Sequence, residues 1–291
     1  MKKKAFRIGV LTGGGDCPGL NAAIRAVSKS LIINCSAEII GIHDGFLGLI
    51  EQRTKILNYV DCSGILSQGG TILGTNNSAS PFNFKGKDVS NEVMDYYISL
   101  GLDGLVVIGG DGTLSIAYEM SKMGMNIVGI PKTIDNDLMG TDRTFGFDTA
   151  IGTVTDALDR LRTTGQSHKR IMILETMGRY AGWIALHAGI AGGADVIIIP
   201  EFAYDIDEVA KACKSRMGEQ HYSIIVVAEG ARQVGGQLTV RETNEFGADP
   251  IRLGGIANVL KMQLEKKIDA EIRATTLGHI QRGGSPSAYD R

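Results

Sequence analysis

Short apolar runs alternate with longer amphipathic stretches along most of the chain. The runs that predict β-strands cover residues 7–12, 38–43, 104–109, 126–131, 170–176, 196–201, 223–229 and 273–278. Several of them are unbroken and rich in β-branched residues, which is typical of strands covered on both faces. Helical spacing predicts a helix from Leu114, a second through Ile151 and a third from Asp205 or Asp207. This alternation predicts an α/β fold with mainly parallel sheets.

Two of the apolar runs end in glycine-rich turns that lead into helices, at residues 12–19 and 109–113. Glycine lets the backbone approach a ligand closely, and a helix N-terminus offers N–H groups and a positive dipole end to an anion. Asp111 in the second turn suits a Mg²⁺ ion held between a carboxylate and substrate phosphates. A tight strand-to-helix connection is the alternative for the second turn. The chain lacks GxxxxGK[ST], GxGxxG and the protein-kinase motifs HRD and DFG.

Two carboxylates, Asp135 and Asp137, follow the predicted strand at 126–131. In open α/β sheets, ligands bind beyond the carboxyl ends of the strands. Residues two apart on an extended segment point to the same side, so both carboxylates can face one substrate. One can then accept a proton while the other orders a metal ion or a hydroxyl group. A solvated turn with two ordinary acids is the alternative.

The latter half of the chain carries arginines at the ends of apolar runs. A planar guanidinium binds phosphate through two parallel hydrogen bonds, although a single such arginine more often forms a surface ion pair. The residues concerned are Arg170, Arg179, Arg273 and Arg282, with His279 close to the last. His279 can equally be a core histidine. Glycine turns in the first half and arginines in the second suggest a phosphate donor that faces a phosphorylated acceptor.

Composition narrows the class of protein. The formal net charge of −2 and the pI of about 6.2 argue against a nucleic-acid partner. The four cysteines show no CxxC and no disulfide framework, which fits a reducing cytoplasm. No apolar run reaches the roughly 20 residues of a membrane span, and the Met-Lys-Lys-Lys start does not lead into a signal peptide. We therefore expect a cytoplasmic enzyme with no membrane partner.

The motifs resemble those of the 6-phosphofructokinase family, in one order and over nearly all of the chain. The resembling segments are LTGGGDCPGLNAAIR (11–25), GGTILG (69–74), IGGDGT (108–113), PKTIDND (131–137), TFGFDTA (144–150), MGRYAGWIALHAGIAGGAD (177–195), VAEGA (227–231) and RATTLGHIQRGGSPSAYDR (273–291). The resemblance implies two doubly wound α/β domains with mainly parallel sheets and the active site in the cleft between them. We expect a nucleotide- and Mg²⁺-binding domain over 1–143, completed by 281–291, and a sugar-phosphate-binding domain over 144–280.

The implied reaction is phosphoryl transfer from MgATP to the 1-hydroxyl of fructose 6-phosphate, a step of glycolysis, in a homo-oligomer that is a tetramer or a dimer. Asp135 resembles the family's general base, with Asp137, Thr133 and Arg179 also catalytic, and Asp111 resembles its Mg²⁺-linked carboxylate. The resemblance places the nucleotide at Gly14, Gly15, Gly110, Asp111, Gly112 and Thr113. It places fructose 6-phosphate at Thr133, Asp135, Asp137, Met177, Gly178, Arg179, Glu229, His279 and Arg282. Arg170 and Arg273 resemble residues that reach the neighbouring subunit's site.

The chain departs from the family pattern in three respects. Residues 75–80 lack the arginine that many members carry to support the transferring phosphate. Gly112 resembles ATP users, because pyrophosphate users typically carry Asp there, whereas Lys132 resembles pyrophosphate users. The chain stops at Arg291, where members usually continue. A pyrophosphate-dependent enzyme and a weakly active regulatory paralogue that binds sugar phosphate are therefore the alternatives.

Regulation by an allosteric effector is only partly indicated. Arg25 and Lys29 share one predicted helical face, but the basic residue expected near Tyr59 is missing. A solvated basic face explains the pair as well as an effector site does, so the sequence leaves both interpretations open.

Overall fold

The computed structural model describes residues 6–243 and 251–291. These residues form two compact units. Unit 1 comprises the chain up to residue 133 together with 138–146 and 282–291, and unit 2 comprises 134–137 and 147–281. The expected domains had their boundaries after residues 143 and 280. The units differ from them chiefly at 134–137, a short segment that belongs to unit 2 although unit 1 surrounds it in the sequence.

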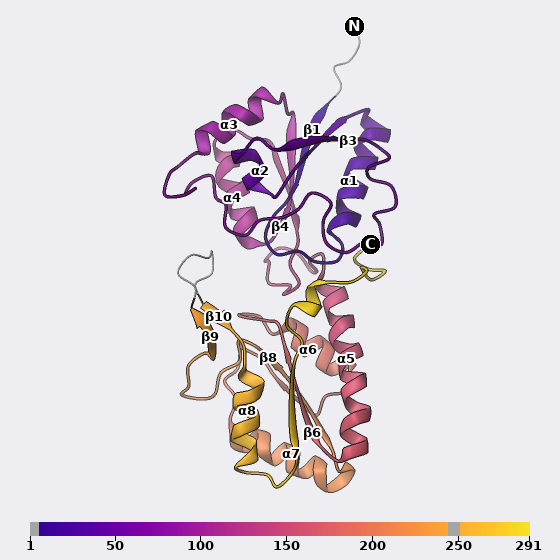
Figure 1. Ribbon diagram of the computed structural model, residues 1–291, viewed down its shortest axis with the longest axis vertical. Coiled ribbons are helices and arrows are strands. Elements are labelled where there is room, and N and C mark those ends of the chain that lie inside the picture. The colour runs from indigo at the N-terminus through magenta and orange to yellow at the C-terminus, as the bar shows by residue number, and fades with distance from the viewer. Residues whose placement is uncertain (1–5, 244–250) are drawn as a thin grey trace. The chain divides into compact units, whose positions relative to one another are not determined.

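Unit 1 is built on a five-stranded sheet of order β3-β2-β1-β4-β5, parallel except for the β2–β3 pair. The strands are β1 (Arg7–Thr12), β2 (Glu38–Ile42), β3 (Thr54–Leu57), β4 (Gly104–Gly109) and β5 (Ile127–Pro131). The helices are α1 (Leu20–Cys35), α2 (Phe46–Ile50), α3 (Ser90–Ser99) and α4 (Asp111–Lys122). Figure 1 shows α1 on one face of this sheet and α2, α3 and α4 on the other. Buried aliphatic side chains such as Leu105 and Val107 fill the second interface.

Unit 2 is built on a four-stranded parallel sheet of order β11-β6-β8-β7. The strands are β6 (Ile171–Thr176), β7 (Val196–Ile198), β8 (Ser223–Ala228) and β11 (Ile272–Thr276), and β9 (Val240–Thr243) and β10 (Ile251–Leu253) form a separate antiparallel pair. The helices are α5 (Phe147–His168), α6 (Trp183–Ala191), α7 (Ile206–Gln220) and α8 (Ile256–Glu265). A 3₁₀ turn, Gly278–Arg282, follows β11. Side chains of α7 and α8 share one core with β6 and β8, and α5 and α6 pack on the same sheet.

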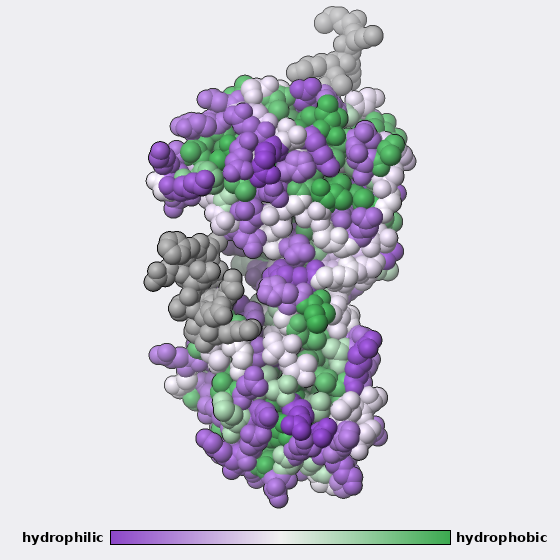
Figure 2. Space-filling model, viewed as in Figure 1, coloured by the Kyte–Doolittle hydropathy of each residue, from purple (hydrophilic) through white to green (hydrophobic). Residues whose placement is uncertain are grey.

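The predicted α/β class and mainly parallel sheets are confirmed, and each predicted strand is present within a few residues. The predicted strand at 196–201 ends at Ile198 because Pro200 cannot donate to a sheet. The helix expected from Leu114 begins at Asp111, so the second glycine turn already belongs partly to the helix. Hydrophilic side chains cover much of the surface seen in Figure 2. None of the helices in the described ranges is long and apolar enough to cross a membrane.

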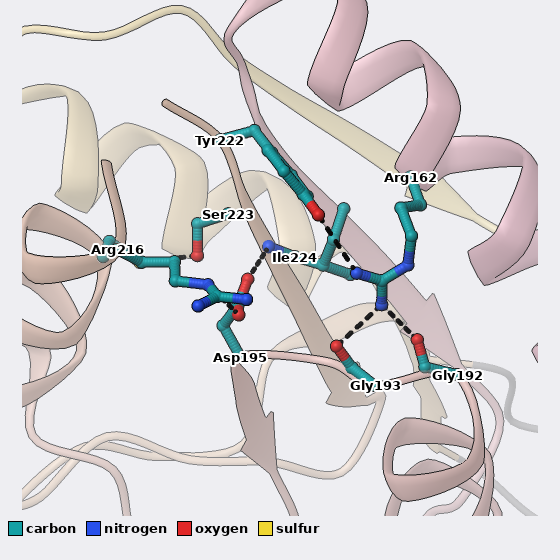
Figure 3. Close-up of polar contacts among 9 residues, drawn as sticks. Arg162, Gly192, Gly193, Asp195, Arg216, Tyr222, Ser223 and Ile224 are labelled. Atoms are coloured by element: carbon teal, nitrogen blue, oxygen red, sulfur yellow. Dashed lines mark hydrogen bonds and ion pairs between the residues drawn. The ribbon is translucent and has the colours of Figure 1, made fainter. Parts of the chain in front are cut away.

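The amino edge of the unit 2 sheet is held together by two arginines (Figure 3). Arg216 of α7 contacts Asp195 at 2.7 Å between Nε and Oδ1, and the other Asp195 oxygen accepts a hydrogen bond from the Ile224 N–H at 2.8 Å. Arg162 of α5 donates to the carbonyls of Gly192 and Gly193 after α6 and to the Tyr222 hydroxyl. Both arginines therefore tie a helix to the chain that enters β7 or β8.

Replacing Asp195 with Ala should lower the free energy of unfolding by about 2 kcal/mol. The change leaves the buried N–H of Ile224 and the partly buried guanidinium of Arg216 without their acceptor. Thermal unfolding of both proteins at equal concentration measures the effect. The control is Asp156→Ala on α5, since the Asp156–Arg160 pair is 66% and 78% exposed, against 11% for Asp195. An equal change in both variants would contradict a special role for Asp195.

Candidate functional site

The topology of unit 1 creates a binding point at the carboxyl ends of β1 and β4. These two strands are parallel neighbours, with Thr12 beside Ile108. The chain continues from β1 through α1 to β2 on one side and from β4 through α4 to β5 on the other. Ligands of open α/β sheets bind where the strand order reverses in this way. Both glycine turns singled out in the sequence lie at this point.

The two turns pack against each other so tightly that they require glycine. The Gly13 N–H donates to the Ile108 carbonyl at 3.0 Å. A Cβ on Gly13 would lie 2.6 Å from the Thr113 side chain, and a Cβ on Gly109 would lie 2.5 Å from it. Thr113 therefore fills the space between the turns and fixes their separation.

The first turn of α4 leaves its backbone donors available. Gly110 precedes the helix with no side-chain cap, and the first helical hydrogen bond runs from the Leu114 N–H to the Gly110 carbonyl at 2.9 Å. Among the described residues, none accepts from the N–H groups of 111–113. A Cβ on Gly112 would meet nothing within 4 Å. This helix start offers N–H groups and open space to an anion.

The other glycine turn is braced by residues that the sequence analysis did not select. Thr75 Oγ1 donates to the Gly14 carbonyl at 2.5 Å, and the Gly14 N–H donates to the Asn76 carbonyl at 3.2 Å. These residues belong to the segment that was noted only for its missing arginine. Because hydroxyl and amide side chains are common in turns, no pattern in the sequence marks this contact.

Two cations lie against the same turn. Lys132 Nζ donates to the Gly15 carbonyl at 2.6 Å from a side chain that is almost fully buried. Arg282 Nη1 donates to the Asp16 carbonyl at 3.2 Å, and a Cβ on Gly15 would lie 2.5 Å from the same nitrogen. Arg282 belongs to unit 1 and lies beside the first glycine turn, and its assignment to the sugar phosphate stays a prediction.

The residues of this region fit a metal ion that arrives with phosphate. In the part of the chain that the structure describes, no group of three or more His, Cys, Asp or Glu residues is arranged to hold a metal ion. Asp111 is an exposed carboxylate in the first turn of α4, directly beside the uncapped N–H groups. Mg²⁺ usually binds through one or two carboxylates plus substrate phosphates, so one acid at this place suffices.

The carboxyl ends of β6, β8 and β11 bring together a second group of predicted residues, in unit 2. Backbone bonds join them: the Glu229 N–H donates to the Thr176 carbonyl at 2.9 Å, and the Gly230 N–H donates to the Gly178 carbonyl at 3.1 Å. Gly178 has a φ of 130°, which an L side chain rarely adopts. The loop after β6 and the loop after β8 are therefore locked together next to Met177 and Arg179.

Gln281 is a further residue of this site that the sequence analysis did not select. Its side chain is fully buried. Its Oε1 accepts from the Met177 N–H at 3.3 Å, and its Nε2 donates to the Gly278 carbonyl at 3.0 Å. The buried amide thus fixes the loop after β6 to the turn that carries His279. Because Gln281 lies between His279 and Arg282 in the sequence, its position could have indicated that it belongs to this site.

Glu229 is the residue of this group with a strongly perturbed acidity. Burial, followed by the negative charges of Asp135 and Glu175, raises the pKa of Glu229 from 4.5 to about 7. The Arg179 charge and a backbone hydrogen bond at Gly178 act in the opposite direction. Because burial is the largest cause, Glu229 is mainly a case of a carboxyl group that loses water.

The PKTIDND motif (131–137) does not continue β5 as an extended strand. The sequence argument for Asp135 and Asp137 assumed that it does. The strand ends at Pro131, and Asn136 has a φ of 52°, so the alternation of an extended strand does not apply to Asp135 and Asp137. Thr133 belongs to unit 1, where its carbonyl accepts from Thr144 Oγ1 at 2.6 Å. Asp135 and Asp137 belong to unit 2. Asp135 is close enough to Glu229 to act on its pKa, whereas Asp137 is exposed.

Arg170 and Arg273 lie at the amino end of the unit 2 sheet, away from the carboxyl ends that carry Gly178 and Glu229. Both guanidinium groups bind Glu271, and the Arg170 contact is 2.5 Å. The hydrogen bond from Arg170 and the charges of both arginines lower the pKa of Glu271. These two arginines are therefore separate from the other predicted residues within unit 2.

Lys29, one of the two basic residues on α1, has a local partner. Lys29 Nζ lies 3.7 Å from the centre of the Tyr59 ring and 2.9 Å from Ser63 Oγ. A cation over an aromatic face is a stabilising surface contact, which accounts for Lys29 without an effector.

Comparison with known proteins gives a consistent result. The profile of the phosphofructokinase family matches residues 7–291. The ATP-dependent 6-phosphofructokinase 2 of Clostridium perfringens is 52% identical over 303 residues, which cover 100% of this chain and 82% of that protein. The pyrophosphate–fructose 6-phosphate 1-phosphotransferase of Amycolatopsis methanolica is 46% identical over 286 residues, which cover 98% of this chain and 83% of that protein.

A solved structure of phosphofructokinase from Saccharomyces cerevisiae superposes with a TM-score of 0.82 at 34% identity, covering 98% of this chain and 39% of that one. The glycine turns of unit 1 and the arginine-bearing loops of unit 2 lie within the matched range. The chain belongs to the phosphofructokinase family.

Proposed function

We propose that this chain catalyses phosphoryl transfer from MgATP to the 1-hydroxyl of fructose 6-phosphate, giving fructose 1,6-bisphosphate and ADP. The observation that carries the choice of donor is the open space at Gly112, beside the uncapped start of α4. A nucleotide needs room next to its phosphates, and an acidic side chain at this position would occupy that room and repel them. Several relatives about 52% identical to this chain are named as ATP-dependent 6-phosphofructokinases.

Unit 1 holds the donor in this proposal. The N–H groups of 111–113 bind phosphate oxygens, and Lys132 and Arg282 place positive charge at the other glycine turn. This charge substitutes for the arginine that residues 75–80 lack. Asp111 would hold Mg²⁺, which neutralises charge on the transferring phosphate when bound. Gly14 and Gly15 let the backbone approach the nucleotide.

Unit 2 holds the acceptor. Asp135 accepts the proton of the sugar 1-hydroxyl, with Asp137 orienting the same group. Arg179 and His279 supply donors to the sugar phosphate and its hydroxyls, next to the backbone of Met177 and Gly178. Below its pKa of about 7, Glu229 is neutral and donates a hydrogen bond to a sugar hydroxyl.

A homo-oligomer completes the acceptor site. Arg170 and Arg273 are held by Glu271 at the amino end of the sheet, where they serve the acceptor site of a neighbouring subunit. The surface for that neighbour is α6, whose exposed face carries Trp183 and Ile190, 42% and 68% exposed. Such an apolar helical face is stabilised by contact with a second copy.

Pyrophosphate is the second candidate donor. Lys132 resembles the residue of pyrophosphate users, and two relatives 46% identical to this chain are named as pyrophosphate-dependent enzymes. We propose a cytoplasmic location for this reaction.

The deciding experiment measures fructose 1,6-bisphosphate formed from fructose 6-phosphate with ATP and with pyrophosphate side by side. Faster turnover with pyrophosphate would overturn the ATP assignment, and no product with either would favour a regulatory paralogue.

Replacing Gly112 with Asp should lower kcat/KM for ATP by at least about tenfold, because a carboxylate beside the phosphates repels them. The protein should fold normally, since a Cβ at this position meets nothing within 4 Å. Gly112→Ala is the matched control and should keep most ATP activity. Initial rates at varied ATP measure both variants. An aspartate variant that uses ATP as well as the wild type would remove Gly112 from the donor site.

Replacing Glu229 with Gln should change how stability depends on pH. The folded chain binds more protons than the unfolded chain between pH 4.5 and about 7, so the wild type loses stability as pH rises through this window. The glutamine side chain cannot ionise, so the variant should gain about 3 kcal/mol relative to the wild type between pH 4.5 and pH 8. Unfolding in urea at both pH values tests this. The exposed Glu208→Gln is the control, and parallel pH curves for wild type and Glu229→Gln would refute the raised pKa.

Replacing Asp135 with Asn should lower kcat by roughly 10²–10⁴ with little change in either KM, because the lost proton acceptor works mainly in the transition state. Refolding this variant together with Arg273→Ala should restore substantial activity. A mixed oligomer contains sites that combine an intact Asp135 with an intact Arg273 from the neighbour. Rates of the mixture and of each variant alone give the answer.

The control mixture pairs Asp135→Asn with Asp135→Ser, which offers no intact base and should stay inactive. If the mixture of Asp135→Asn and Arg273→Ala recovers no activity while both variants are folded and oligomeric, Arg273 does not act across a subunit boundary.

A further inference from the structure

Glu175 is a buried acid at the centre of unit 2 to which neither the sequence analysis nor the proposed reaction gives a role. It is 1% exposed and lies one residue before the end of β6. Its neighbours in the sheet are Thr276 of β11 and Val227 of β8. A carboxyl group is almost never buried so fully unless its oxygens are hydrogen-bonded.

The carboxylate of Glu175 caps a helix from another element. Oε1 accepts from the Gly255 N–H at 3.0 Å, and Oε2 accepts from Gly255 at 3.1 Å and from Ala257 at 2.9 Å. These are the first N–H groups of α8, whose own N-cap residue, Gly255, has no side chain to satisfy them. A negative charge at a helix N-terminus is also favoured by the helix dipole. One residue of β6 thus replaces the cap that α8 lacks.

The same residue is tied to the acceptor site by its backbone. The Glu175 carbonyl accepts from the Leu277 N–H at 3.1 Å, at the start of the turn that carries His279. Two residues after Glu175 the chain forms the loop with Met177 and Arg179. On its other side, α8 packs its Ala257 and Leu260 into the core of the sheet. Glu175 therefore connects α8 to two of the loops that would hold the sugar phosphate.

The charge of Glu175 also reaches Glu229. The charged groups that act on Glu229 are Asp135 and Glu175, which raise its pKa, and Arg179, which lowers it together with a backbone hydrogen bond at Gly178. Asp135 is assigned to proton transfer, and Arg179 to the phosphate. The proposed reaction gives Glu175 no contact with substrate, because its carboxylate oxygens bind the N–H groups of Gly255 and Ala257.

We propose that Glu175 is a positioning residue of the acceptor site, which anchors the start of α8 to the end of β6 and places a fixed negative charge near Glu229. The statement that Glu175 serves a sugar-phosphate site rests on the proposed function. The anchoring of α8 to β6 by Glu175 applies equally to the protein without substrate. The chemical class of ligand that benefits is a sugar phosphate, whose hydroxyl groups need a donor that is not a second negative charge.

The test compares Glu175→Gln with Glu175→Asp. Glutamine keeps the length and removes the charge, so the titration of Glu229 should move to lower pH. Aspartate keeps the charge and loses the reach, so Glu229 should titrate nearly as in the wild type while the Gly255 and Ala257 amides exchange faster. The Cδ resonance of Glu229 in ¹³C-glutamate-labelled protein follows the titration, assigned by its loss in Glu229→Gln. Amide hydrogen exchange follows the helix start.

In the enzyme assay, both variants should raise the KM for fructose 6-phosphate by about tenfold, as expected for a lost charge-assisted contact, and leave the KM for ATP unchanged. Glu175→Gln should also move the pH profile of the fructose 6-phosphate KM to lower pH. The matched control is Asp205→Asn, which removes charge from the cap of α7, where Asp205 Oδ1 accepts from the Asp207 N–H at 2.8 Å. The control should leave the Glu229 titration and both KM values unchanged.

An unmoved Glu229 titration in Glu175→Gln, or unchanged amide exchange in Glu175→Asp, would overturn the proposal. A wild-type protein that fails to phosphorylate fructose 6-phosphate would instead overturn the proposed function, and the resonance and exchange measurements would still decide the role of Glu175.

Discussion

Parallel strand pairing is the constraint on which the rest of the structure depends. Pairing of β1 with β4 and of β6 with β8 places the carboxyl ends of neighbouring strands side by side, in each unit separately. The loops that follow then meet at close range, as Gly13 and Thr113 do in unit 1 and Gly178 and Gly230 do in unit 2. Chemistry is confined to these edges because the strands themselves are covered by helices on both faces.

The two edges have opposite electrostatic character. In unit 1, the edge offers uncapped N–H groups and the cations Lys132 and Arg282, with Asp111 as the acid in the first turn of α4. In unit 2, the charges of Asp135, Glu175 and Arg179 all act on the buried Glu229. A polyanionic nucleotide suits the first edge. The second suits a ligand with many hydroxyl groups and one phosphate, because hydroxyls can donate to carboxylates and accept from a neutral acid.

The sequence was sufficient for the fold class and for the glycine turns, because both are written in local patterns: unbroken β-branched runs, and glycines followed by helical spacing. It was not sufficient for contacts made over long distances. Glu175 caps a helix about 80 residues away, and Thr75 braces a turn 61 residues away. The Asp135 and Asp137 argument used the alternation of a strand that ends at Pro131. Hydrophobic periodicity predicts single helices and strands, whereas these contacts form between residues of different helices, strands and loops.

Asp135 and Glu175 lie close enough to Glu229 to raise its pKa, and the three acids sit in different environments. A sugar phosphate is itself negative, so three ionised carboxylates near its site would repel it. The negative charge of Glu175 is compensated by hydrogen bonds from the N–H groups at the start of α8 and by the dipole of that helix. Burial favours the neutral form of Glu229. In the proposed reaction, Asp135 is the member of this group that acts as the general base. The separation of roles follows from environment, since all three side chains carry the same functional group.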